Sequence, residues 1–172
     1  MGVSGSGKSL VGNHLADCLG EVSQPAMELV FVDGDDLHPI ENVELMRAGI
    51  KLDDETRKPW LDAICECAES HFAENRSLVV ACSALKKKYR EQLRSVSGSV
   101  YFVFLEGPEE LIQERMQARQ GHYMPSSLLK SQFADLENPT GEPGVVNVDI
   151  SQSKKEVQAQ ALEKVRAVVA AR

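Results

Sequence analysis

One short segment near the start constrains this chain more than any other. It fits the pattern of Gly, four residues of any kind, then Gly-Lys and Ser or Thr, without a mismatch. Its members are Gly2, Val3, Ser4, Gly5, Ser6, Gly7, Lys8 and Ser9. Glycines let successive backbone N–H groups turn inward around an anion, and a following helix adds the positive end of its dipole. Because a helical spacing of Val11, Leu15 and Leu19 follows directly, we interpret the segment as a phosphate-binding loop rather than a flexible Gly/Ser loop.

The two polar side chains that end this loop predict which phosphates it holds. A lysine in this position reaches the β- and γ-phosphates of a nucleotide, and the hydroxyl after it coordinates Mg²⁺. We therefore expect Lys8 to act in catalysis and Ser9 to be a metal ligand, with ATP and Mg²⁺ as cofactors. GTPases and mechanical ATPases share the motif, but the sequence has no N-K-x-D guanine signature and, at 172 residues, no room for the extra domains of most motors. The combination favours a small-metabolite kinase.

The rest of the chain alternates short apolar runs with longer helical patterns. That alternation predicts an α/β fold with a mostly parallel sheet, and the near-continuous apolar runs predict helices on both faces, in three α/β/α layers. The four predicted strands are 29–32, 78–82, 100–105 and 145–148, and the six predicted helices are 9–19, 59–74, 86–96, 108–119, 127–136 and 154–170. Pro59 and Pro108 are placed in first helical turns, and Gly20 and Gly98 just past helix ends. Length and composition suit a single domain over residues 1–172.

Composition excludes several other classes of protein. The formal net charge of −7 argues against a general nucleic-acid binder, which needs an excess of clustered Lys and Arg. No apolar stretch is long enough to cross a membrane and no secretory signal opens the sequence, so we expect a cytoplasmic protein that does not bind membranes. The cysteines lack metal-ligand spacing and are expected to be buried free thiols. They are Cys18, Cys65, Cys67 and Cys82.

Polar side chains gather where the first predicted strand ends, at the edge where ligands bind in open α/β sheets. Asp33, Asp35, Asp36 and His38 lie there. Their carboxylates and imidazole can hold a hydroxylated substrate, orient Mg²⁺ and accept a proton from an attacking hydroxyl. A solvated turn is the alternative, but the phosphate loop beside it favours a substrate site.

Two later segments add cations to this edge. The guanidinium of Arg57 matches planar oxyanions, while Trp60, the only tryptophan, is expected in the core. After the second predicted strand, Lys86 and Arg90 are spaced to share one helix face toward the crevice. The two lysines that follow Lys86 are expected to face solvent.

Residues 115–137 have the layout of a lid, with a helix, a glycine and a second helix. Arg115 and Arg119 end the first helix, and Gly121 is the expected hinge. A closing lid excludes water and brings arginines onto the transferring phosphoryl group. An ordinary helical hairpin with solvent-facing arginines is the alternative.

Taken together, these blocks resemble the gluconokinase family, within the shikimate kinase and adenylate kinase type of P-loop fold. Besides the phosphate loop, the resemblance rests on residues 33–39, 57–61, 82–90, 121–122 and 131–133, in family order and spacing over nearly the whole chain. It implies transfer of the ATP γ-phosphoryl group to the 6-hydroxyl of D-gluconate, and a homodimer. Two alternatives stay open: a kinase of the same fold for shikimate, a nucleoside monophosphate or adenylylsulfate, and a nucleotide-binding regulator with little activity.

The resemblance also implies roles for individual side chains. The substrate-binding set would be Asp33, Asp35, His38, Arg57, Lys86, Arg90, His122 and Gln132. Within this set, Asp33 would also support Mg²⁺, and Asp35 would orient or deprotonate the acceptor hydroxyl. Arg115 would lie near the adenine, and Arg119 would act in catalysis near the phosphates.

The chain begins inside the phosphate-loop motif, whereas such a loop normally follows a strand. In the resembling family that strand is central in the sheet and often ends in Met-Gly-Val-Ser, which is how this sequence opens. We therefore expect Met1 to be an internal methionine, with the family's first strand missing from this sequence.

Overall fold

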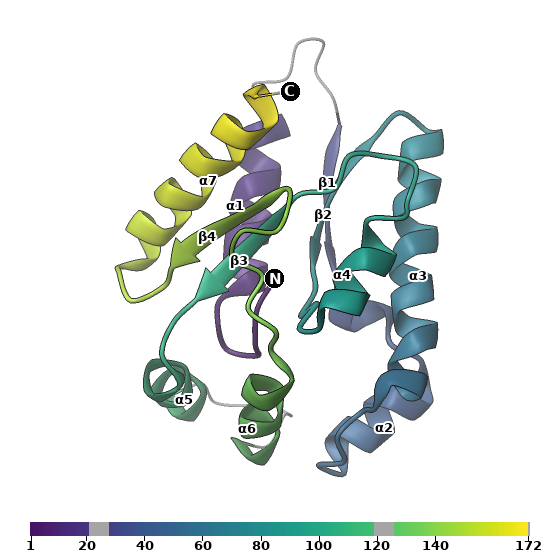
Figure 1. Cartoon of the computed structure of the whole chain (residues 1–172), viewed down its shortest axis with the longest axis vertical. Helices are drawn as coiled ribbons and strands as arrows, with labels where there is room; N and C mark the ends of the chain where they lie inside the picture. The colour runs from purple at the N-terminus through teal and green to yellow at the C-terminus, as the bar shows by residue number, and fades with distance from the viewer. Residues whose placement is uncertain (21–27, 119–125, 172) are drawn as a thin grey trace.

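The computed structural model describes residues 1–20, 28–118 and 126–171. Helices and strands alternate along it (Figure 1). In chain order they are α1 (Lys8–Gly20), β1 (Leu29–Asp33), the 3₁₀ helix η1 (Gly34–Leu37), α2 (Ile40–Arg47), α3 (Asp54–Ala73), β2 (Ser77–Ala81), α4 (Lys87–Leu93), β3 (Phe102–Glu106), α5 (Glu109–Ala118), α6 (Ser126–Asp135), β4 (Val145–Asp149) and α7 (Lys154–Ala170).

The described strands form two parallel pairs. β1 pairs with β2 from Leu29 opposite Ser77, and β3 pairs with β4 from Phe102 opposite Val145. The first residues of the chain connect the two pairs: the Met1 amine donates to the Val103 carbonyl, Leu105 N–H donates to the Met1 carbonyl, and Gly2 N–H donates to Ser83. The prediction of an α/β fold with parallel strands is therefore confirmed.

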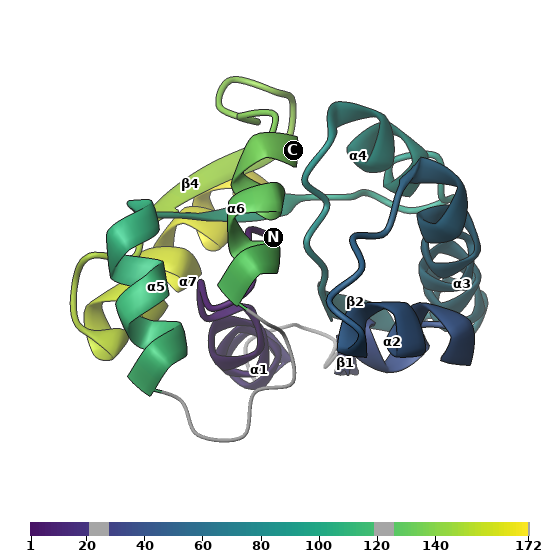
Figure 2. The ribbon, with the colours of Figure 1, turned by 90° about the horizontal axis from the view of Figure 1, so that it is seen from below.

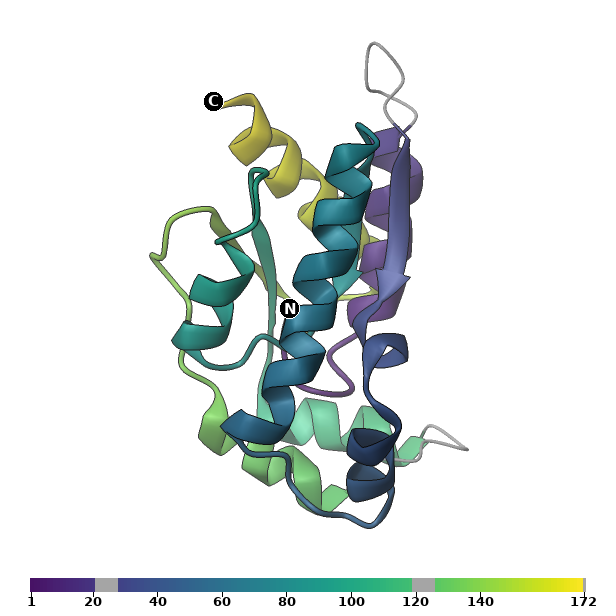
Figure 3. The same ribbon diagram turned by 90° about the vertical axis from the view of Figure 1, so that its right-hand side faces the viewer.

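Helices cover both faces of these strands. On one face, α1 packs on β1, β2 and α7, and α7 packs on β4. On the other face, α3 packs on β2 and also contacts α4 (Figure 2). Figure 3 shows that the strands run toward the end of the molecule that carries α2, α5 and α6. This arrangement is the predicted three-layer α/β/α fold, and it brings the loops after the strands together at one end.

Two clusters of buried apolar side chains hold the loops of this end in place. One cluster contains Val3 from the phosphate loop together with Leu105 and Ile112. The other contains Trp60 and Tyr89, on α3 and α4. Both sides of the candidate site are thus anchored in packed core.

Four details of the sequence prediction were wrong. α3 begins at Asp54 rather than Pro59, because the Asp53 side chain caps it by accepting from Thr56 N–H at 2.8 Å, and Pro59 therefore lies inside the helix. α2 was not predicted, since Asn42 and Met46 are its only buried residues and its apolar pattern is weak. α4 ends at Leu93, so the glycine at position 98 does not terminate it, and Gly20 is the last residue of α1 rather than beyond it.

No helix in the described ranges is long and apolar enough to cross a membrane. The four cysteines are free thiols, with Cys82 buried and the others half-buried. Burial raises the pKa of the Cys82 thiol to about 11, so this side chain is neutral and behaves as a small apolar group.

Candidate active site

The phosphate loop presents a desolvated lysine at the start of α1. Gly5 and Gly7 have φ of 80° and 97°, a region that favours glycine, so the loop can curl back on itself. The Lys8 ammonium donates to the Val3 carbonyl at 3.1 Å. Burial lowers the pKa of Lys8, an effect that the nearby Asp35 partly offsets. A partly buried, desolvated cation of this kind is suited to receive an anion.

Ser9 and Asp33 lie together beside this lysine. The Ser9 hydroxyl donates to Asp33 Oδ2 at 2.6 Å, and Asp33 Oδ1 accepts from Asp35 N–H at 3.1 Å, which caps η1. A hydroxyl and a carboxylate are the oxygen donors that Mg²⁺ prefers, and this ion usually keeps waters and substrate phosphates as its other ligands. Both side chains therefore fit the predicted metal-binding role.

The Asp33–Asp35 turn is fixed by the core of α3. The Trp60 indole N–H donates to the Gly34 carbonyl at 2.6 Å. A Cβ on Gly34 would lie 2.6 Å from the Ala81 carbonyl oxygen, so only glycine allows the turn to approach β2 this closely. Trp60 was predicted to be a core residue, and it is 1% exposed. It also sets the position of the acidic turn.

His38 stacks on the same indole. The two rings are 4.3 Å apart between centroids and inclined by 8°. Burial and, to a smaller extent, the charge of Arg57 together lower the pKa of His38 to about 4. The imidazole is therefore neutral at pH 7, with its Nδ1 3.5 Å from the Asn42 amide nitrogen, and it can exchange hydrogen bonds with a hydroxylated ligand.

The tryptophan contact gives a first prediction. Trp60→Phe keeps an aromatic ring under His38 but removes the donor to the buried Gly34 carbonyl, which should cost about 1–3 kcal/mol of unfolding free energy. It should also raise the KM for the acceptor more than the KM for ATP, because the acidic turn loses its support. Denaturant unfolding and steady-state kinetics measure the two effects, and unchanged values of both would contradict this role.

Arg57 and Lys86 lie around the Tyr89 ring. The Arg57 guanidinium carbon and the Lys86 ammonium are 5.9 and 5.8 Å from the ring centroid. Arg57 is buried, donates from Nε to the Leu52 carbonyl at 3.2 Å and lies 4.0 Å from Asp135. Two residues predicted to bind the substrate are thus brought together around one aromatic ring.

Arg90 does not join them, and its contacts differ from those expected of a substrate-binding residue. Its side chain is fully buried and donates from Nε and Nη2 to Glu142 at 3.0 and 2.5 Å. Its Nη1 donates to the carbonyls of Ala84 and Leu85 at 3.0 and 2.8 Å. Ala84 is buried at a φ of 44°, so Arg90 stabilises a strained turn. Lys86 is the N-cap residue of α4, with an extended backbone, and lies outside the helix. Lys86 and Arg90 therefore do not share a helix face.

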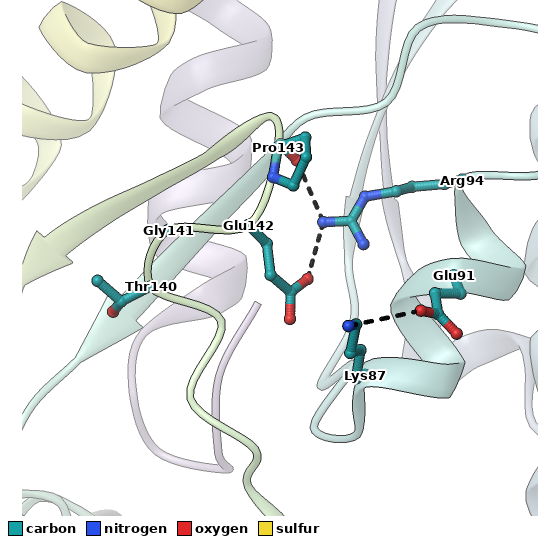
Figure 4. A pocket seen from close by; sticks show the side chains of 7 residues that line it. All are labelled: Lys87, Glu91, Arg94, Thr140, Gly141, Glu142 and Pro143. Atoms are coloured by element: carbon teal, nitrogen blue, oxygen red, sulfur yellow. Dashed lines mark hydrogen bonds and ion pairs between the residues drawn. The ribbon is translucent and has the colours of Figure 1, made fainter.

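Glu142 joins this turn to the segment before β4. Figure 4 shows Arg94 reaching Glu142 as well, with its Nη2 at 2.9 Å, in an open pocket also lined by Lys87 and Glu91. The carboxylate is bound by two guanidinium groups, and hydrogen bonding from Arg90, above all, lowers its pKa to about 2. The charges that face this pocket are thus largely paired with each other.

The low pKa of Glu142 predicts how stability depends on pH. A carboxyl whose pKa falls on folding stabilises the native state above its unfolded pKa, near 4.5, and this contribution is lost as the pH falls toward about 2. Glu142→Gln should therefore lower the melting temperature at pH 7 and approach the wild-type value near pH 2 to 3. Melting curves across this pH range measure the difference, and a pH-independent gap would contradict the ion pair.

Gln132, on α6, contacts the phosphate loop. Its side-chain oxygen accepts from Ser4 N–H at 2.6 Å, and the side chain is buried. Arg115 donates to the Ile150 carbonyl at 2.7 Å, just after β4. The structure thus ties α6 to the phosphate loop and α5 to the end of β4, on the side opposite α2 (Figure 2). For Gln132 this differs from the predicted contact with the acceptor.

The predicted lid is only partly described. Arg119, His122 and the hinge glycine lie outside the described residues, so their predicted roles have no structural counterpart. Within α6, Leu129 is 2% exposed and belongs to the same buried cluster as Val3. The C-terminal half of the expected lid is therefore part of the packed core.

Sequence reasoning missed several contacts that shape this site. Asp54 binds Lys86 across 32 positions, and Glu142 binds Arg90 across 52 positions. Asn42 belongs to the helix that was not predicted. Contacts at such separations leave no periodic signal in one sequence. The Asp53 cap does leave a signal, because two further acidic residues, Asp54 and Glu55, follow it before a helical pattern.

A Gly-rich loop that opens a helix, a desolvated lysine and a hydroxyl–carboxylate pair at the strand ends together define a P-loop kinase. A family model described as an AAA domain matches residues 1–139. The chain is 44% identical to the thermosensitive gluconokinase of Escherichia coli K12, over 98% of this chain and 86% of that protein. It is 40% identical to the thermoresistant gluconokinase of the same strain, over 96% and 91%.

Solved structures agree with these relatives. A gluconokinase from Sinorhizobium meliloti 1021 superposes with a TM-score of 0.87 at 45% identity, covering 99% of this chain and 91% of that one. The APS kinase CysC of Mycobacterium tuberculosis, at 19% identity and a TM-score of 0.69, shares the fold. The chain therefore belongs to the gluconokinase family of P-loop kinases.

Proposed function

We propose that this protein transfers the γ-phosphoryl group of ATP to the 6-hydroxyl of D-gluconate, giving 6-phospho-D-gluconate and ADP. The observation that carries the proposal is that acidic and cationic side chains meet at the ends of the strands. The Lys8 loop and the Asp33–Asp35 turn adjoin a group of cations, Arg57 and Lys86, in a protein whose net charge is −7. Identity of 44% and 40% to two gluconokinases supports gluconate as the anion.

Each side chain then has a chemical role in the transfer. Lys8 neutralises charge that develops on the phosphoryl oxygens, and Ser9 with Asp33 would hold the Mg²⁺ that screens the phosphates. The acceptor oxygen bonds to the γ-phosphorus while the bond to the β–γ bridging oxygen breaks, and the Asp35 carboxylate takes the hydroxyl proton. Arg57 and Lys86 bind the acid end of the substrate and His38 its hydroxyls. Arg115 would lie near the adenine, and the roles of Arg119 and His122 stay predictions.

A coupled assay of ADP release tests the proposal across acceptors of this fold. D-gluconate, shikimate, adenylylsulfate and nucleoside monophosphates are compared at equal concentration with MgATP. We expect turnover with D-gluconate alone. Turnover with another acceptor instead would assign a different kinase, and ATP binding without turnover on any acceptor would indicate a regulator. A cytoplasmic location and a homodimer stay predictions.

A further inference from the structure

A carboxylate of the protein itself is held by three donors at the acceptor end of the site. Asp54 Oδ1 accepts from the Lys86 ammonium at 2.8 Å and from the Tyr89 hydroxyl, and Asp54 Oδ2 is 2.5 Å from the Lys88 ammonium. Together with Arg57, these residues form what we call the Tyr89 cluster. Its cations Arg57, Lys86 and Lys88 lie 5.8–5.9 Å from the centroid of the Tyr89 ring.

The Tyr89 cluster is continuous with the groups that face the acceptor. Arg57 acts electrostatically on both His38 and Tyr89. His38 stacks on Trp60, which holds the acidic turn at Gly34. We therefore expect a substrate whose hydroxyl lies at this turn to extend past His38 toward the Tyr89 cluster.

The donors around Asp54 match what a substrate carboxylate needs. Two ammonium groups and a phenol hydroxyl bind both oxygens of one carboxylate. The three cations face two carboxylates, Asp54 and, 4.0 Å from Arg57, Asp135, so one positive charge remains in excess. These donors hold the pKa of Asp54 well below its usual range, so its carboxylate stays ionised. Lys88 is exposed, as expected from the sequence, and its ammonium also pairs with Asp54.

We propose that Asp54 occupies the carboxylate subsite of the free enzyme, and that the carboxylate of the acceptor replaces it between Lys86, Lys88 and Tyr89. This inference rests on the proposed function and extends it. Asp54 becomes an internal competitor for the substrate, and Lys88 and Tyr89 become substrate-binding residues. The side chains of Asp54 and Lys88 are 42% and 56% exposed, and exposed ion pairs are weak enough to exchange.

Replacing Asp54 tests the competition directly. Asp54→Asn should lower the gluconate Kd and KM about fivefold while leaving the KM for ATP unchanged, because the substrate no longer displaces an anion. Calorimetry of gluconate binding without nucleotide gives the Kd, and ADP release gives the KM values. Asp62→Asn is the matched control: Asp62 lies on the same helix, is 40% exposed and is bound by Lys58 at 2.6 Å. The control should change nothing.

Replacing Lys88 tests the subsite itself. Lys88→Met should raise the gluconate Kd about fivefold, whereas Lys87→Met, one residue away and 63% exposed, should not. Melting temperatures verify that all variants fold. Weaker binding in Asp54→Asn would show that Asp54 positions the lysines, and unchanged binding in either test variant would equally overturn the inference.

These outcomes are distinct from failure of the proposed function. If the wild type turns over gluconate and Asp54→Asn does not tighten binding, only the inference fails. If the wild type does not turn over gluconate, the proposed function fails and the inference fails with it.

Discussion

Lys8→Met is expected to reduce phosphoryl transfer by about 10²–10³-fold, because the loop loses the charge that meets the γ-phosphoryl oxygens. The variant should melt at or above the wild-type temperature. Burial lowers the pKa of Lys8, so the native state carries this charge at a cost that the methionine removes. Initial-rate kinetics and thermal unfolding measure both effects.

A surface lysine provides the control for this variant. Lys58 is 69% exposed and pairs with Asp62, so Lys58→Met should leave the rate and the melting temperature near their wild-type values. Near-normal turnover in Lys8→Met would contradict the catalytic role, and a large fall in its melting temperature would contradict the argument from burial.

Arg90→Met is expected to have the largest effect on stability, about 3–5 kcal/mol of unfolding free energy. It leaves Glu142 with only Arg94 and removes two donors from the carbonyls of the Ala84 turn. The gluconate KM of the protein that remains folded should change little, because Arg90 does not reach the acceptor. Denaturant unfolding and the KM at low temperature separate the two effects.

Arg76 is the matched control for Arg90, since it pairs with Glu74 at the surface and its replacement should cost little. The predicted pattern is a large loss of stability with little change in the gluconate KM. The sequence alone, which suggested that Arg90 binds the substrate, leads to the opposite pattern. A large rise in gluconate KM with normal stability would return Arg90 to the substrate site.

The elements that sequence predicts well here are those with a local cause. The phosphate loop follows from its glycines, and each strand from a short apolar run, because such runs are buried between two helical layers. α2 escapes prediction because it is only eight residues long and Ile40, its first residue, is 73% exposed. The predicted α3 is too short because Pro59 suggests a first helical turn, whereas the Asp53 cap starts the helix at Asp54.

The acceptor side of the site depends on contacts between distant parts of the chain. Spacing alone places Lys86 and Arg90 on one face, but a strained turn and the cap of α4 separate them. Only the structure shows that Glu142 forms an ion pair with Arg90, and that Asp54 forms ion pairs with Lys86 and Lys88. Residue types therefore indicated a site for a hydroxylated, anionic substrate, and the family resemblance indicated gluconate. The pairing of charges within the site had to come from the structure.

The position of the transferred phosphate tests the central claim most directly. The wild-type protein is incubated with MgATP and D-gluconate, and the product is analysed by phosphorus NMR with proton coupling. We expect one new phosphate monoester, coupled to the protons on carbon 6, formed together with ADP. An ester at another carbon, or ADP formed without a gluconate ester, would contradict the assignment.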